Sequence, residues 1–162
     1  MNRKALLLVA TLPMTACGYT FGSGLHQQGI QTVHLKVVGN ETWRQRLEAE
    51  LGAELARELP VSTDLLPADA RTADATLEVV IGDARERTLV VGDRQNPKRE
   101  GSLEGLVRIR LVRKSDGVAV VERDIVDRTE FRDPIAEDLT SARAELISDL
   151  ARKIALALEA SF

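Results

Sequence analysis

Few residues of this 162-residue chain have types and spacings that support chemistry. The two histidines, His26 and His34, lack further ligands at the spacing of a zinc site. The chain also has neither a Gly-rich phosphate loop nor a G-x-S-x-G nucleophile motif. Acidic pairs such as Asp133 with Glu137 fit charges at a helix start, where the helix dipole favours them. A hydrolase built from two carboxylates is the enzymatic alternative, but we expect no enzyme, no cofactor and no metal site.

Cys17 is the single cysteine of the chain, so it cannot form an internal disulfide and must be structural, reactive or modified. The residues before it favour modification. Arg3 and Lys4 form a positively charged start, residues 5–12 form a short apolar segment, and Pro13 ends that segment. The segment is too short to cross a bilayer core of about 30 Å as a helix. It fits a signal peptide over residues 1–16.

Met14-Thr15-Ala16-Cys17 resembles the bacterial lipobox, in which a diacylglycerol is attached to the cysteine before cleavage. The resemblance implies lipidation of Cys17 and a membrane anchor, since two or three acyl chains hold far more firmly than one. An ordinary signal peptide followed by an incidental cysteine is the alternative. In lipoproteins of enterobacterial type an aspartate after the cysteine favours the inner membrane. Gly18 therefore implies a lipid anchor in the outer membrane, on the periplasmic side.

The mature chain of 146 residues would be long enough for one domain with a real core. Its charged and apolar fractions are those of a globular protein. The formal net charge of the full chain is −3, and loss of Arg3 and Lys4 with the signal peptide lowers it to −5. Nucleic-acid binding requires a dominant basic field, so we expect no nucleic-acid partner.

A basic cluster stands out in the polar stretch from Gly92 to Gly101. Arg94, Lys98 and Arg99 have only Asp93 and Glu100 as acidic neighbours there. Unpaired lysines and arginines suit phosphate groups, so these three residues are a candidate site for an anionic ligand. A solvated loop is the alternative.

The first half of the mature chain predicts a tether, a strand and a helix. Residues 17–29 contain four glycines and read as a tether into a single domain over residues 30–162. Alternating apolar residues predict a strand over 30–38. Thr42 and Gln45 match a capping box, and Pro60 is expected to end the helix that follows. The apolar stripe of this helix consists of Trp43, Leu47, Leu51, Leu55 and Leu59.

Two further strands are predicted on either side of the polar stretch. Alternation predicts one strand from Ala75 to Ile81, which the apolar residues up to Val91 would lengthen, and another from Leu103 to Leu111. Ser115-Asp116-Gly117 then fits a three-residue hairpin loop with Gly117 in the left-handed conformation. That loop predicts the pairs Leu111–Val121, Val107–Ile125, Arg110–Glu122 and Arg108–Asp124.

This register favours a solvated face of ion pairs for Arg108 and Arg110, since each is opposite an acid. Ile109 opposite Arg123 does not fit the pattern, and a β-bulge is the one explanation we find.

Asp133-Pro134 predicts the start of a final helix, as a cap followed by a first-turn proline. Apolar residues then recur at spacings of three and four up to Ala160. The expected order is β-α-β-β-β-α. We predict an α+β two-layer sandwich, with one antiparallel-rich, four-stranded sheet and both helices on one face. Water or a partner would cover the other face.

These features together resemble the LPS-assembly lipoproteins, the LptE family. The resemblance is carried by Cys17-Gly18-Tyr19-Thr20-Phe21 after the lipobox, by the strand, Gly-Asn-Glu-Thr segment and helix over residues 30–59, and by the final helix. It implies a plug and assembly factor of the large outer-membrane β-barrel (LptD-like) that inserts lipopolysaccharide into the outer leaflet. It also implies lipopolysaccharide binding, and assigns it to Lys98 and Arg99 with Arg94 nearby.

A second function class is a periplasm-facing accessory lipoprotein that regulates an envelope enzyme or a secretion channel. Lipoproteins of the curli-secretion and synthase-activator kinds also begin with a strand, an Asn-rich turn and a helix. Their folds continue with alternating strands and helices. The three successive strands predicted here favour the assembly role.

Overall fold

The computed structural model describes residues 24–42, 46–91, 99–133 and 138–159. Three helices and five strands lie within these ranges. Their bounds are α1 Gly24–Gln27, β1 Thr32–Asn40, α2 Leu47–Ser62, β2 Leu66–Pro67, β3 Ala75–Val90, β4 Arg99–Arg113, β5 Ala119–Asp133 and α3 Leu139–Glu159. The predicted signal peptide and Cys17 lie outside them. None of the helices in the described ranges is apolar over a stretch that could cross a membrane.

The strands form one mixed sheet in the order β2-β1-β3-β4-β5. β1 is parallel to both β2 and β3, whereas β3, β4 and β5 are antiparallel neighbours. The parallel β1–β3 pair arises because the chain crosses over through α2 between them. The prediction of four strands is therefore wrong by one. β2 has two residues and hence no periodicity, so only its pairing with Thr32 and Val33 defines it.

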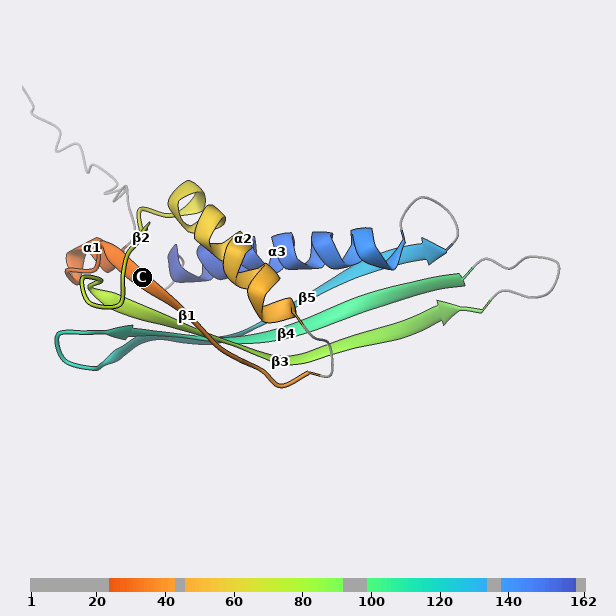
Figure 1. Ribbon diagram of the computed structural model, residues 1–162, viewed down its shortest axis with the longest axis horizontal. Coiled ribbons are helices and arrows are strands. Elements are labelled where there is room, and N and C mark those ends of the chain that lie inside the picture. The colour runs from red at the N-terminus through yellow and green to blue at the C-terminus, as the bar shows by residue number, and fades with distance from the viewer. Residues whose placement is uncertain (1–23, 43–45, 92–98, 134–137, 160–162) are drawn as a thin grey trace, which may run out of the picture.

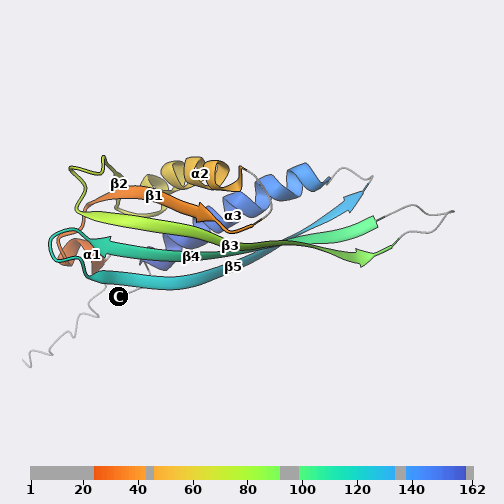
Figure 2. The same cartoon turned by 60° about the horizontal axis from the view of Figure 1, so that its bottom comes forward.

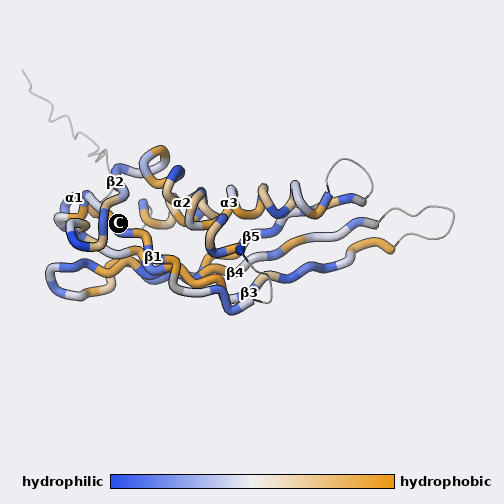
Figure 3. The backbone as a smooth tube through the Cα atoms, viewed as in Figure 1, coloured by the Kyte–Doolittle hydropathy of each residue, from blue (hydrophilic) through white to orange (hydrophobic). Residues whose placement is uncertain are grey.

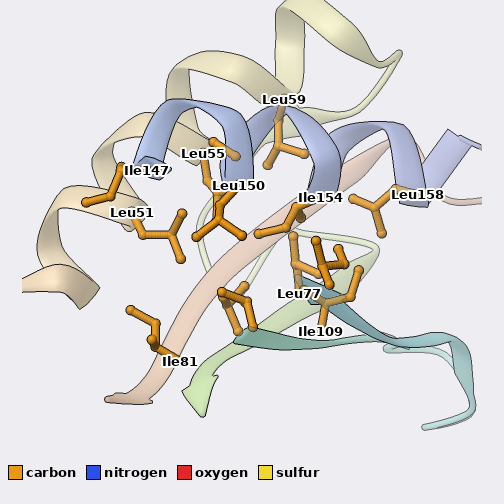
Figure 4. Packing of buried hydrophobic residues seen from close by; sticks show 14 of the residues in the cluster. Leu51, Leu55, Leu59, Leu77, Ile81, Ile109, Ile147, Leu150, Ile154 and Leu158 are labelled. Carbon is orange, nitrogen blue, oxygen red and sulfur yellow. The ribbon is translucent and has the colours of Figure 1, made fainter. Parts of the chain in front are cut away.

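The α+β two-layer architecture is confirmed, because α2 and α3 cover one face of the sheet and leave the other face bare of helices (Figures 1 and 2). We call these the helix-covered face and the helix-free face. The core lies between the layers, where leucines and isoleucines of both helices meet alternate residues of β3 and β4 (Figure 4). The predicted stripe of α2 is buried at Leu47, Leu51, Leu55 and Leu59, whereas Trp43 lies outside the described residues.

Helix α2 differs from its prediction at both ends. It begins at Leu47, after Arg46 in the left-handed conformation with φ of 74°. Thr42 lies before the helix, with its amide bonded to Asn40, and Gln45 is outside the described residues, so the capping box does not start α2. The helix also continues past Pro60 to Ser62. Proline removes one donor from the last turn, but burial of Leu59 and the bond from the Thr63 amide to its carbonyl hold that turn.

The predicted extension of the second strand is confirmed, since β3 runs to Val90. The prediction that the polar stretch is a loop up to Gly101 is wrong, because β4 begins at Arg99. Gly101 pairs with Thr88 on β3 and Phe131 on β5. A Cβ on Gly101 would overlap the Phe131 ring, so glycine is the residue that lets this ring close over the strand.

All four cross-strand pairs predicted between β4 and β5 are confirmed. Gly117 has the predicted left-handed conformation, with φ of 72°. The turn is nevertheless one residue longer than expected, since the Arg113 amide bonds the Val118 carbonyl. A bulge at Val120, between the partners of Leu111 and Val112, restores the register.

Helix α3 begins at Leu139, so the prediction that Asp133 caps it is wrong. Pairing with β4 keeps the chain extended through Asp133. Asp138 is the cap, and its carboxylate accepts the amides of Thr140 and Ser141 at 3.0 and 2.8 Å. The bond from the Ser141 amide lowers the pKa of Asp138. Pro134 and Ile135 lie outside the described residues.

The domain begins before the first predicted strand. Helix α1 lies within the segment predicted as a tether, and its Leu25 is fully buried, as is Ile30 after it. This segment therefore packs with the core through Leu25.

Candidate functional site

The end of the β3–β4 hairpin is an exposed part of the described sheet. Thr88–Val90 at the end of β3 and Arg99–Gly101 at the start of β4 run past the ends of α2 and α3, so the sheet projects beyond its helices (Figure 1). We call these two segments the distal hairpin. Figure 1 places it at the opposite end of the molecule from α1.

The distal hairpin ends in three consecutive exposed apolar side chains. Leu89, Val90 and Val91 are 44%, 49% and 81% exposed. They form the hydrophobic end of β3 in Figure 3, next to strongly hydrophilic segments. We call these residues the apolar tip. Apolar side chains exposed together mark an interaction site more often than single ones do.

The base of the tip is a well-packed part of the sheet. Phe131 of β5 is buried over Gly101, and Leu103 is buried behind it. On the helix-free face, Arg132 and Glu100 form an ion pair across the strands at 3.3 Å. The tip is therefore presented by a hairpin that β5 supports from one side.

Of the three predicted site residues, Arg99 lies within the described ranges. Arg99 is the first residue of β4, with its backbone opposite Asp133. Arg94 and Lys98 lie outside the described residues, between Val91 and Arg99. The candidate basic cluster is thus part of the connection that follows the apolar tip directly. Lipidation of Cys17 and lipopolysaccharide binding at the cluster stay predictions.

The helix-free face carries a row of alternating charges across four strands. Lys36 bonds Glu78 at 3.2 Å, and Arg110 lies 3.9 Å from both Glu78 and Glu122. The interpretation of Arg110 as part of an ion-pair face is confirmed. Arg108 also belongs to this face, but its ion pair at 2.9 Å is with Glu41 rather than with Asp124 opposite it.

A shallow groove of about 200 Å³ lies on this face between β3, β4 and β5. Its lining combines charges of both signs, including Glu78, Arg108, Arg110 and Asp124. Acids and bases that neutralise one another leave little net field for a charged ligand. The groove suits solvent or a partner surface of mixed charge.

Ile109 and Arg123, the pair that did not fit the predicted pattern, are opposite each other without a bulge at that position. Ile109 is buried in the middle of the sheet, whereas Arg123 is exposed on the border strand β5. A border position lets an arginine cover apolar surface with its stem and keep its charge in water.

The described residues contain no group of three or more His, Cys, Asp or Glu side chains arranged to hold a metal ion. Asp74 is densely hydrogen-bonded: its Oδ2 accepts the Thr32 hydroxyl at 2.7 Å and the amides of Gln31 and Thr32 at 3.1 and 2.8 Å. The Thr32 hydroxyl, followed by the two amides, lowers the pKa of Asp74. This acid ties β1 to β3, which is a structural task.

Sequence reasoning missed the apolar tip. Leu89-Val90-Val91 is an apolar run that reads as the buried end of a strand, and only the absence of helix cover at this point exposes it. The one available signal was its position immediately before a polar, basic stretch.

The sequence matches no family model and no curated protein. Several solved structures share the fold. A hypothetical protein from Chlamydia trachomatis has a TM-score of 0.59 and 14% identity, covering 80% of this chain and 96% of its own. A putative lipoprotein from Caulobacter crescentus has a TM-score of 0.51 and 18% identity, covering 74% of this chain and 87% of its own.

A minor lipoprotein from Acinetobacter baumannii has a TM-score of 0.50 and 14% identity, covering 81% of this chain and 92% of its own. This is a fold of bacterial lipoproteins. At these identities the comparison establishes the architecture alone.

Proposed function

We propose that this protein is a lipid-anchored lipoprotein of the outer membrane, facing the periplasm. In this role it docks as plug and assembly factor on the β-barrel that inserts lipopolysaccharide into the outer leaflet. It acts by binding and not by catalysis. The observation that carries the proposal is the apolar tip on a hairpin that projects beyond the helices.

A projecting hairpin suits docking into a concave partner. Leu89 and Val91 offer apolar surface that a partner can remove from water. Burial of such surface stabilises a complex by about 25 cal/mol for each Å². Three strands form this end of the sheet, since Asp133 of β5 is opposite Arg99, the first residue of β4, and β3 ends at Val90 (Figure 1). The lumen of a large barrel is a concave surface of suitable width.

The neighbouring basic cluster supports the same partner. Arg94, Lys98 and Arg99 follow the apolar tip in sequence, and lipopolysaccharide combines acyl chains with phosphate groups. Apolar and cationic side chains that follow one another along the chain match that combination. We therefore propose lipopolysaccharide as a ligand of this end.

Co-purification from the native bacterium tests the proposal. Tagged protein extracted in mild detergent should retain one outer-membrane β-barrel near one to one. Leu89→Ser with Val91→Ser should lose most of that barrel, because the apolar contact is removed. Val61→Ser with Leu66→Ser is the matched control, since both side chains are exposed (79% and 59%) and lie in α2 and β2 instead.

Wild-type protein that elutes alone, with barrel assembly unaffected by its depletion, would refute the assembly role. Retention of an envelope enzyme or a secretion channel in place of the barrel would establish the regulatory alternative.

A further inference from the structure

The 15-residue strand β5 forms one border of the sheet (Figure 2). In an antiparallel sheet, every second residue of a border strand directs its N–H and C=O away from its neighbour. Such an edge strand is a template for the addition of another strand, and proteins protect it by specific features. The middle of β5 carries such a protecting feature.

Two side chains occupy the backbone groups at the centre of this border. The Asp127 carboxylate accepts the Arg128 amide at 2.8 Å and the Lys153 ammonium at 2.7 Å. Lys153, from α3, also reaches the Val126 carbonyl at 3.5 Å. We call this arrangement the Asp127–Lys153 clasp. It interrupts the free border in the middle of β5, between Ile125 and Thr129.

Stabilisation of the fold is a poor explanation of the Asp127–Lys153 clasp. Asp127 is on the helix-covered face, opposite Gly105, where Leu146 and Leu150 pack above the strand. Its side chain is 11% exposed, and its Oδ2 is buried without a hydrogen-bond partner among the described residues. A buried acceptor without a donor costs stability. An inward-pointing charge on a border strand is, however, a known protection against strand addition.

The strand that the clasp excludes is β5 of a second copy. An antiparallel β5 pair centred on Ile125 would place Glu122 opposite Arg128 and Arg123 opposite Asp127, twice each because of the two-fold symmetry. Both copies would keep their helices on the same side of the joined sheet. This pair requires the Val126 carbonyl and the Arg128 amide, the two groups that the clasp occupies. We infer that the Asp127–Lys153 clasp keeps the protein from pairing through β5 with its own copies.

The test compares self-association of the full chain in mild detergent by sedimentation velocity. Wild-type protein should be monomeric when partner-free. Asp127→Val with Lys153→Met frees the border and should dimerise, with association tighter by on the order of tenfold or more. Lys36→Met with Glu78→Val removes an ion pair of the sheet away from β5 and should remain monomeric.

Charge swaps identify the excluded strand. Added to the clasp-free variant, Arg128→Glu should weaken the dimer by placing two acids opposite each other, and Glu122→Arg should then restore it. Amides of Asp124 and Val126 should become protected from hydrogen exchange only in the dimer. A dimer that is indifferent to these swaps would show that another surface forms it.

A clasp-free variant that stays monomeric while the core amides of Val107 and Ile109 remain protected would overturn the inference. A wild-type dimer with protected Asp124 and Val126 amides would overturn it as well. If the core amides of the double variant lose their protection from hydrogen exchange, the single variant Lys153→Met replaces it in the test. This side chain is half-exposed, so it can be replaced without opening the core. That variant should self-associate at high concentration, and a strictly monomeric Lys153→Met protein would overturn the inference.

Discussion

Asp74 shows how one carboxylate can hold two strands in place. Its Oδ2 receives three donors from Gln31 and Thr32 at the start of β1, while Asp74 itself precedes β3. Replacement by alanine would leave the donors of β1 without this acceptor. The parallel β1–β3 register therefore depends in part on a residue in a connection.

Asp74→Ala should lower the free energy of unfolding by about 1–2 kcal/mol near neutral pH, the scale of hydrogen bonds to a partly exposed charged group. Because the folded-state pKa is lowered, the stabilisation is complete above 3.8, the ordinary pKa of this group, and is lost as the pH falls through the folded-state pKa. The difference between wild type and variant in urea unfolding should shrink below pH 3.8. Asp64→Ala, at an exposed acid, is the control, and an equal pH effect there would contradict the assignment.

Substitution of Lys98 and Arg99 tests the proposed lipopolysaccharide binding. Lys98→Asp with Arg99→Asp should weaken lipopolysaccharide binding by about 1.5–3 kcal/mol for each desolvated charge-assisted bond, and by much less if the contact stays wet. Stability should change by under about 0.5 kcal/mol. Binding measured over a salt series separates a specific site from diffuse attraction, which screening removes.

Arg71→Asp with Arg152→Asp gives the matched control. Both arginines are exposed and neither is on the distal hairpin, and the pair changes the net charge by the same amount. Equal loss of lipopolysaccharide binding in the two double variants would mean that overall charge, and not a specific site, causes the loss. Unchanged binding in the Lys98 and Arg99 variant would reject this site.

At the scale of elements, apolar spacing predicted which segments pair and pack. The four-residue repeat of α2 and the alternation of β3 both correspond to buried faces. The ends of helices and strands were harder to predict, because each end depends on a competition between neighbouring interactions. Asp133 could begin a helix by its own chemistry, but pairing with β4 keeps it in β5 and leaves the cap to Asp138.

Pro60 provides a test of this competition in α2. A proline in the last turn lacks the amide that would bond the Ala56 carbonyl, and its ring crowds that carbonyl. Pro60→Ala should therefore raise the free energy of unfolding by about 1 kcal/mol, after allowance for the greater freedom of the unfolded chain. Thermal unfolding should show a higher Tm. A lower Tm would mean that the proline favours the turn into Thr63 and β2.

At the scale of the whole molecule, the described domain is elongated, with α1 and the apolar tip at opposite ends (Figure 1). The chain enters the domain at α1, the element closest in sequence to Cys17. An anchor on Cys17 would thus join the end of the domain that does not carry the tip. The proposed lipid anchor and the proposed docking of the apolar tip therefore belong to opposite ends of the domain.

Cys17→Ser should abolish acyl labelling in the bacterial host and leave the precursor uncleaved or the product released from the membrane. The reason is that thioether attachment of the diacylglycerol requires the thiol, and two or three acyl chains make release negligible. Metabolic labelling with a fatty acid, followed by membrane fractionation, measures both effects. Wild-type protein without acyl label would disprove the anchor.

The sequence by itself determined the α+β class, the apolar faces of both long helices and the pairing of β4 with β5. Periodicity records which side of an element is buried, and opposite charges at matched positions record the register. Tertiary structure alone decided the rest. The strand β2, the bulge at Val120 and the last residues of β5 exist because neighbouring strands offer hydrogen bonds that no local pattern reports. Exposure of the apolar tip and the clasp on the border strand depend on where the helices stop and where Lys153 comes to lie, and such distances between remote segments are fixed only when the layers pack.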